Sequence, residues 1–98
     1  MKKVYINESN IHGRGIFTND DIKTGEVIGV SHVTHDRVWY QVFPLGIFYN
    51  HSIKPNCVVK KEGNVNLVVA SKDIKQHEEL TVDYTKQLHL EQPKEDWI

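Results

Sequence analysis

The stretch Tyr49-Asn50-His51-Ser52-Ile53-Lys54-Pro55-Asn56-Cys57 concentrates hydrogen-bond donors, acceptors and an imidazole in one short segment. Pro55 and Asn56 oppose a regular helix, so the stretch is expected to be a loop. Polar loops carried by a rigid scaffold often bind ligands. A single histidine is more often structural, but the adjacency of Asn50, His51 and Ser52 gives a binding role equal weight.

The sequence on both sides of this stretch predicts a mainly β protein with little helix. A glycine-containing turn, Glu62-Gly63-Asn64, separates Val58-Val59 from Leu67-Val68-Val69 and predicts an antiparallel hairpin. A helical turn or two is expected only near residues 34–40 or 86–91. The other apolar runs are short, rich in β-branched and aromatic residues, and interrupted by turn-forming residues, at 4–6, 15–17, 27–33, 38–43, 57–59, 65–70 and 80–84.

One internal echo links residues 20–28, Asp-Asp-Ile-Lys-Thr-Gly-Glu-Val-Ile, to residues 72–80, Lys-Asp-Ile-Lys-Gln-His-Glu-Glu-Leu. Each copy is a polar turn leading into a strand. Gly25 can adopt a positive φ at no steric cost, whereas His77 stands at the matching place, so backbone strain is expected at His77. Two copies this short indicate pseudo-symmetry within one β domain rather than a solenoid.

Two further segments carry chemistry-bearing residues. His12-Gly13-Arg14-Gly15-Ile16-Phe17 has two glycines one residue apart, which alone favours a tight turn between strands over a phosphate or dinucleotide site. Glu78-Glu79-Leu80-Thr81-Val82-Asp83-Tyr84 ends in a tyrosine that, alone, is more often a packing residue than a catalyst.

Taken in order, these segments resemble the SET-domain family of S-adenosylmethionine-dependent protein lysine methyltransferases. The resemblance runs from about residue 3 to residue 84. It rests on Gly13-x-Gly15-x-Phe17, the Asp-Ile-Lys-x-Gly-Glu turn at 21–26, Asn50-His51-Ser52-x-x-Pro55-Asn56-Cys57, and Glu79-Leu80-Thr81-x-Asp83-Tyr84.

The resemblance implies a β-clip fold of short strands and sheets, in which the Asn-His-Ser segment and the Asp-Tyr segment cross in a pseudoknot-like arrangement. It implies Tyr84 as the catalytic residue, orienting the lysine amine. It also implies a set of residues that bind S-adenosylmethionine, namely Gly13, Arg14, Gly15, Asn50 and His51.

Three departures from the family pattern shape the remaining expectations. Ile53 stands where many members have a zinc-binding cysteine, and no cysteine follows Cys57, so no metal site is expected. Residues 85–98, with Trp97 as the aromatic lid, are then expected to cover the cofactor site. The span between Ile28 and Tyr49 is short, so the substrate channel is expected from Trp39, Tyr40 and Tyr49. A tyrosine common after the first Gly-Glu turn is replaced by Val30, Ser31 or His32.

Length and composition fit this interpretation. With 98 residues and 39% hydrophobic composition, residues 1–98 are expected to form a single minimal SET domain. A formal net charge of -1 argues against direct nucleic-acid binding. No apolar run is long enough to cross a membrane, and the amino terminus does not resemble a secretion signal. An intracellular protein is expected, cytoplasmic or, if the chain is viral, in the host nucleus, and the small core makes a homodimer worth considering.

The charge is uneven along the chain. Residues 1–72 hold nine basic and six acidic side chains, and residues 73–98 hold three basic and seven acidic ones. The expected substrate is a lysine-presenting basic protein or peptide, such as a histone. One alternative is a non-catalytic interaction module that retains the cofactor pocket. Another, a metal site at His32-x-x-His35, is weak because a third ligand is missing.

Overall fold

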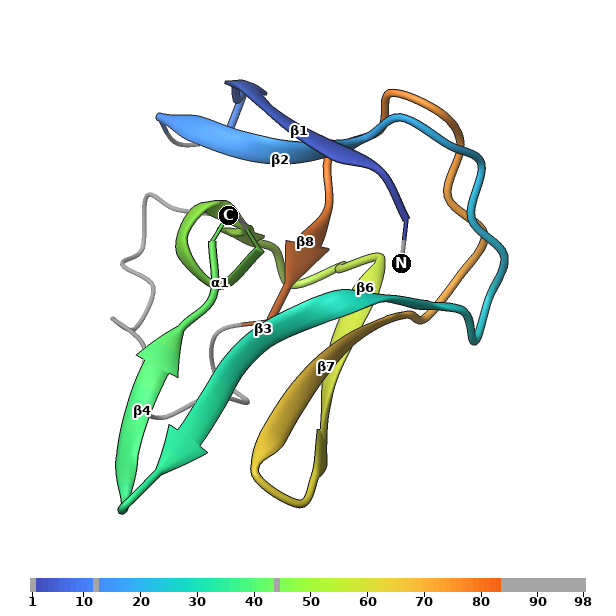
Figure 1. Ribbon diagram of the computed structural model, residues 1–98. Helices are drawn as coiled ribbons and strands as arrows, with labels where there is room; N and C mark the ends of the chain where they lie inside the picture. The colour runs from blue at the N-terminus through green and yellow to red at the C-terminus, as the bar shows by residue number, and fades with distance from the viewer. Residues whose placement is uncertain (1, 12, 44, 84–98) are drawn as a thin grey trace.

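The computed structural model describes residues 2–11, 13–43 and 45–83, which form three small sheets and one short helix (Figure 1). The expectation of a mainly β fold is confirmed. β1 (Val4–Glu8) and β2 (Arg14–Thr18) form an antiparallel pair. The predictions for Tyr84, Trp97 and residues 85–98, including a helical turn near 86–91, lie outside the described residues.

The largest sheet has four strands in the order β4-β3-β7-β6. The predicted hairpin is confirmed, because β6 and β7 pair antiparallel around Gly63, whose φ is 59°. The β3–β4 pair is a hairpin of adjacent strands, whereas β3 and β7 also pair antiparallel although they are far apart in the sequence. The strand bounds are β3 (Val27–His35), β4 (Val38–Gln41), β6 (Cys57–Glu62) and β7 (Val65–Ala70).

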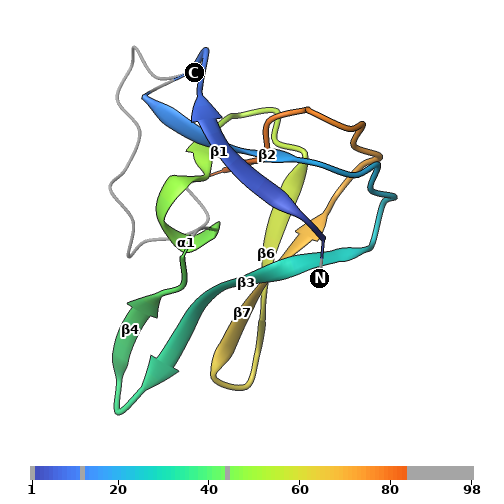
Figure 2. The same cartoon turned by 45° about the horizontal axis from the view of Figure 1, so that its top comes forward.

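The expected helical turn near residues 34–40 is wrong. These residues form the end of β3, a two-residue turn and β4. The turn residues Asp36 and Arg37 have φ values of 50° and 65°, the left-handed pair that matches the twist of a tight hairpin. The helix α1 (Leu45–Phe48) instead follows β4 and lies between the β1–β2 pair and the β4 end of the large sheet (Figures 1 and 2).

The sequence similarity between residues 20–28 and 72–80 corresponds to two similar turns in the structure. The two turns lie against each other and exchange hydrogen bonds of the same kind. Gly25 has a φ of 89° and His77 a φ of 71°, so the strain expected at His77 is confirmed. The reciprocal contacts are Ile22 bridged with Ile74, Thr24 N–H donating to Asp73 Oδ1 at 2.9 Å, and Gln76 N–H donating to Asp21 Oδ1 at 2.8 Å.

A third, parallel pair joins segments far apart in the sequence. β5 (Asn50–His51) lies beside β8 (Thr81–Val82), with Asn50 opposite Thr81 and His51 opposite Val82. This pairing places the Asn-His-Ser segment against the residues that precede Tyr84. The buried apolar side chains around it come from all three sheets and include Ile16, Ile28, Cys57, Val68, Leu80 and Val82.

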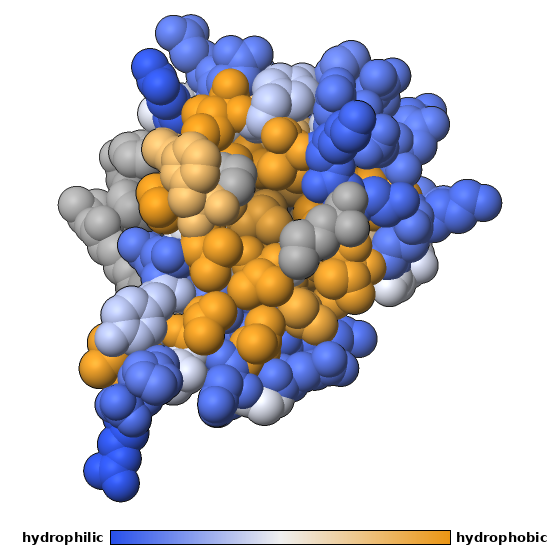
Figure 3. Space-filling model, viewed as in Figure 1, coloured by the Kyte–Doolittle hydropathy of each residue, from blue (hydrophilic) through white to orange (hydrophobic). Residues whose placement is uncertain are grey.

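The surface is unevenly apolar. Apolar residues gather in a broad area on the face seen in Figure 1, bordered by hydrophilic side chains (Figure 3). Several large apolar side chains of β4 and of the segment through α1 are exposed, namely Val38, Trp39, Tyr40, Phe43 and Ile47. Within the described part of the chain, no helix is both long and apolar enough to cross a lipid bilayer.

Candidate functional site

The two glycines of the first motif have different structural reasons. Gly13 has a φ of 51°, and its carbonyl accepts the Ser9 N–H at 2.8 Å, which closes the turn between β1 and β2. Gly15 lies inside β2, where an added Cβ would collide with the Glu79 carboxylate and lie 3.1 Å from Asn50 Nδ2. The motif is therefore more than a tight turn, because a side chain at position 15 would occupy a polar cluster.

Asn50 connects the first motif to the second. Its side chain is buried in β5, and Nδ2 donates to the Arg14 carbonyl at 3.3 Å and to Glu79 Oε2 at 2.8 Å. Of the residues expected to bind the cofactor, the structure thus brings Arg14, Gly15 and Asn50 together. His51 follows Asn50 in β5, and Gly13 precedes Arg14 in the turn that connects β1 and β2.

Glu79 and Ser9 complete this cluster, and sequence reasoning assigned neither a role. Ser9 Oγ lies 2.8 Å from both Glu79 carboxylate oxygens and donates to them. Ser9 Oγ in turn accepts the Ile11 N–H at 2.9 Å, which ties the turn before Gly13 to the cluster. The available signal was the position of Glu79 at the start of the Glu-Leu-Thr motif.

Asn56 holds the second and third motifs side by side. Its Nδ2 donates to the Glu79 carbonyl at 2.7 Å, and its Oδ1 accepts the Thr81 N–H at 2.9 Å. The neighbouring Cys57 thiol donates to Asn56 Oδ1 at 3.3 Å. Burial raises the pKa of the Cys57 thiol to about 12, while a backbone hydrogen bond from Thr81 opposes the shift. The thiol is therefore neutral near pH 7. A neutral, buried thiol is a packing group, because the nucleophilic form of cysteine is the thiolate.

His51 faces the end of the described chain. Its side chain is 3% exposed, and its Nδ1 lies 3.8 Å from Asp83 Oδ1. Asp83 is the residue before Tyr84 in the sequence. The proposed catalytic residue Tyr84 and the proposed lid Trp97 are outside the described residues, so their roles stay predictions.

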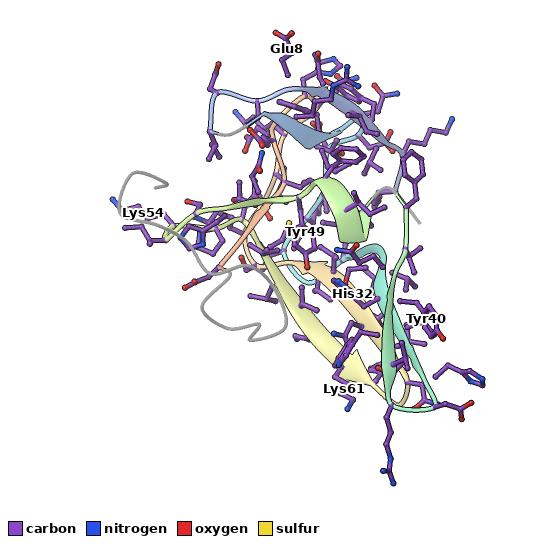
Figure 4. All side chains as sticks on the ribbon, turned by 90° about the vertical axis from the view of Figure 1, so that its left-hand side faces the viewer. Glu8, His32, Tyr40, Tyr49, Lys54 and Lys61 are labelled. Atoms are coloured by element: carbon purple, nitrogen blue, oxygen red, sulfur yellow. The ribbon has the colours of Figure 1, made fainter. Side chains whose placement is uncertain are left out.

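The three residues expected to line the substrate channel do not all lie together. Tyr49 is buried, and the centre of its ring lies 6.3 Å from the centre of the His32 ring. The Trp39 ring also contacts His32, edge-on, with ring centres 6.0 Å apart. Tyr40 follows Trp39 in β4 and therefore faces the opposite side of the sheet. Figure 4 shows Tyr40 directed away from Tyr49 and His32.

The alternative metal site is not supported by the positions of its two histidines. His32 is fully buried, with Nδ1 2.9 Å from Ser31 Oγ, whereas His35 is at the exposed end of β3 beside Asp36. Among residues 2–11, 13–43 and 45–83, no group of three or more His, Cys, Asp or Glu side chains could hold a metal ion.

A hollow of about 310 Å³ adjoins the first motif. The described residues that line it are Ile6, Asn7 and Glu8 of β1 and Arg14 of β2. Arg14 therefore belongs to both features. It is one of the residues that line the hollow, and its carbonyl accepts a hydrogen bond from Asn50 in the buried cluster. This places one exposed cationic side chain next to a ligand-sized space.

Comparison with known proteins identifies the family. The SET domain model matches residues 31–85, which include the Asn-His-Ser and Glu-Leu-Thr motifs and exclude the Gly-x-Gly motif. The chain belongs to the SET domain family. Over 51 residues it is 39% identical to the potential protein lysine methyltransferase SET6 of Saccharomyces cerevisiae. That alignment covers 52% of this chain and 14% of the yeast protein, so this SET domain chain spans a small part of its relative's length.

Solved structures agree on the SET fold. A candidate histone methyltransferase of Plasmodium falciparum matches with a TM-score of 0.68 and 26% identity, covering 86% of this chain and 94% of the other. A humanized mutant of the Chaetomium thermophilum Polycomb Repressive Complex 2 matches with a TM-score of 0.68 and 23% identity, covering 85% of this chain and 15% of the other. The β-clip assignment is thus confirmed, and family membership supports a lysine methyltransferase role.

Proposed function

We propose that this SET domain binds S-adenosylmethionine and transfers its methyl group to a lysine side-chain amine of a basic protein. The observation that carries the proposal is the cluster in which Asn50 donates to the Arg14 carbonyl and to the Glu79 carboxylate, with Gly15 packed against both side chains. These residues come from three separate segments, and one of them, Arg14, also lines a hollow. A histone-like substrate is consistent with the protein substrates of the family.

The residues present fit the cofactor's methionine end, which carries an ammonium and a carboxylate. Arg14 lines the hollow and offers a guanidinium suited to a carboxylate. The Arg14 carbonyl and the Glu79 carboxylate are acceptors suited to an ammonium group. We propose that Gly13, Arg14, Gly15, Asn50 and His51 hold the cofactor, with Trp97 covering it.

The cofactor supplies a methyl group already activated by its sulfonium, so the protein's contribution is mainly positioning. The lysine must arrive as a neutral amine. A water-excluding site disfavours the ammonium form by desolvation, and the buried rings of Tyr49 and His32 provide such surroundings next to β5. We assign Tyr84 the role of orienting the amine, and Trp39 with Tyr49 one wall of the lysine channel.

The partners follow from charge and exposed surface. The excess of acidic residues after residue 72 favours a basic substrate. A second copy of the chain stays a proposed partner, because the exposed side chains of Phe43 and Ile47 supply apolar surface of the kind that interfaces bury. We also propose an intracellular location, without direct binding to nucleic acid or membrane.

Isothermal titration with S-adenosylmethionine and with its demethylated product tests the proposal. The parent protein is expected to bind both compounds. Asn50→Ala is expected to weaken the binding of both at least about tenfold, because it removes the two hydrogen bonds that join Asn50 to the Arg14 carbonyl and to Glu79. Asn64→Ala, an exposed turn variant, is the control. A parent that binds neither compound would contradict the proposed function. Binding without methyl transfer to basic proteins would favour the non-catalytic module.

A further inference from the structure

Glu79 is the side chain on which three segments of the site converge. Its carboxylate accepts from Ser9 Oγ of the β1–β2 connection and from Asn50 Nδ2 of β5. Its main chain is held as well, because Asn56 Nδ2 donates to the Glu79 carbonyl and residue 79 bridges to Phe17 of β2. A carboxylate fixed from both ends has little freedom to turn, so it can act as a rigid reference for its neighbours.

The carboxylate sets the orientation of the Asn50 amide. The atom of Asn50 that faces Glu79 also faces the Arg14 carbonyl, and both partners are acceptors. Only the amide nitrogen satisfies two acceptors, so the oxygen of Asn50 is directed away from them. Without Glu79, one Asn50 N–H would lose its charge-assisted partner and the amide could rotate.

The same carboxylate determines how the glycine segment packs. The Glu79 carboxylate lies where a Cβ of residue 15 would be, and Asn50 Nδ2 lies 3.1 Å from that position. The backbone of β2 therefore approaches the cluster closely only because position 15 has no side chain. Glu79 thus orients Asn50 directly and packs against Gly15, and Asn50 in turn holds the Arg14 carbonyl, so Glu79 contacts both elements proposed to hold the cofactor.

We infer that Glu79 is a positioning residue of the cofactor site, which acts through Asn50 and the Arg14–Gly15 backbone. This inference rests on the proposed function. Glu79 is bonded to protein groups on each side, so it prepares the binding surface before the cofactor arrives. The expected consequence of losing it is weaker cofactor binding, with the loss routed through Asn50.

A double-mutant cycle on cofactor affinity tests this route. Titration calorimetry with the demethylated cofactor product is run on the parent, Glu79→Ala, Asn50→Ala and the double variant. Glu79→Ala is expected to raise Kd by about tenfold to a hundredfold, as for loss of a charge-assisted hydrogen bond. In the Asn50→Ala background, the same change is expected to raise Kd less than about threefold, because its main route of action is already gone.

Two more variants separate positioning from charge and from folding. Glu78→Ala removes the same charge one residue away. The Glu78 side chain is exposed, and among the described residues its carboxylate accepts only from the Lys75 N–H, so this variant should bind the cofactor product like the parent. Glu79→Gln retains an acceptor for Asn50 and should restore part of the affinity. If Glu79→Ala does not fold, amide NMR of Glu79→Gln decides: the Asn50 side-chain resonances should shift and exchange faster.

Several results would overturn the inference. Parent-like affinity of a folded Glu79→Ala protein would do so, as would effects of the two substitutions that simply multiply in the double variant. Unchanged Asn50 side-chain resonances in Glu79→Gln would equally overturn it. These failures differ from failure of the proposed function, which would appear as a parent protein that does not bind the cofactor compounds at all.

Discussion

Asn56→Ala should destabilise the protein more than most single substitutions. The Asn56 side chain satisfies the Thr81 N–H and the Glu79 carbonyl at 2.9 and 2.7 Å, and residues 56 and 81 are buried. Leaving a buried polar group without its partner costs about 1–3 kcal/mol, so two such groups predict a loss of roughly 2–6 kcal/mol. Domains of this size have about 5–15 kcal/mol of stability in total, so the variant should melt about 10 °C lower or more.

Urea unfolding followed by circular dichroism measures this loss. The midpoint should fall while the slope with urea stays unchanged, which would show that the same two-state transition is being compared. Asn64→Ala removes the same side chain from an exposed turn and should stay within about 0.5 kcal/mol of the parent. A loss below about 1 kcal/mol in Asn56→Ala would refute the role assigned to Asn56 in holding β8.

Three further predictions concern stability. Gly46→Ala should cost about 1–3 kcal/mol or more in urea unfolding, because its Cβ would collide with the Ser31 carbonyl, a backbone atom that cannot rotate away; unchanged stability would mean that α1 can shift. The Cys57 thiol ionises at its ordinary pKa of 9.0 when unfolded and at about 12 when folded, so its burial contributes fully below pH 9 and this contribution is lost as the pH rises toward 12. Cys57→Ala should flatten that pH dependence, and an equal slope in both proteins would argue against it. Gly25→Ala should lower the free energy of unfolding by about 1–2 kcal/mol, because a φ of 89° is unfavourable for a residue with a Cβ; a rise in melting temperature would contradict this.

Local sequence signals predicted the elements that local physics determines. The Glu62-Gly63-Asn64 turn gives the β6–β7 hairpin because glycine permits the required φ, and the echo of residues 20–28 in 72–80 gives two matching turns. The hairpin at Asp36-Arg37 was missed, since neither residue is glycine and the left-handed pair is stabilised by strand pairing on both sides. Tertiary context determined that turn.

The site was predictable only where sequence motifs mark its residues. The family motifs identified Arg14, Gly15 and Asn50, which the structure places together. The contacts of Glu79 were not predictable, because Ser9 and Asn50 are far away in the sequence, and the only signal was that the Glu-Leu-Thr motif begins at Glu79. Trp39 and Tyr40 were both predicted to line the substrate channel. Adjacent residues of a strand face opposite sides of the sheet, so the alternation of a β-strand alone would have separated them.

The central claim is methyl transfer to lysine, and mass spectrometry of a reacted substrate tests it most directly. The protein is incubated with S-adenosylmethionine and a mixture of basic histone-type peptides, in parallel with Tyr84→Phe and with identical peptides in which arginine replaces every lysine. The account predicts methylated lysine with the parent, a rate lower by about tenfold to a thousandfold with Tyr84→Phe at parent-like cofactor affinity, and none on the arginine peptides. Methylation that is equal in the two proteins would remove Tyr84 from the site, and a folded, cofactor-bound parent that methylates no lysine would contradict the account.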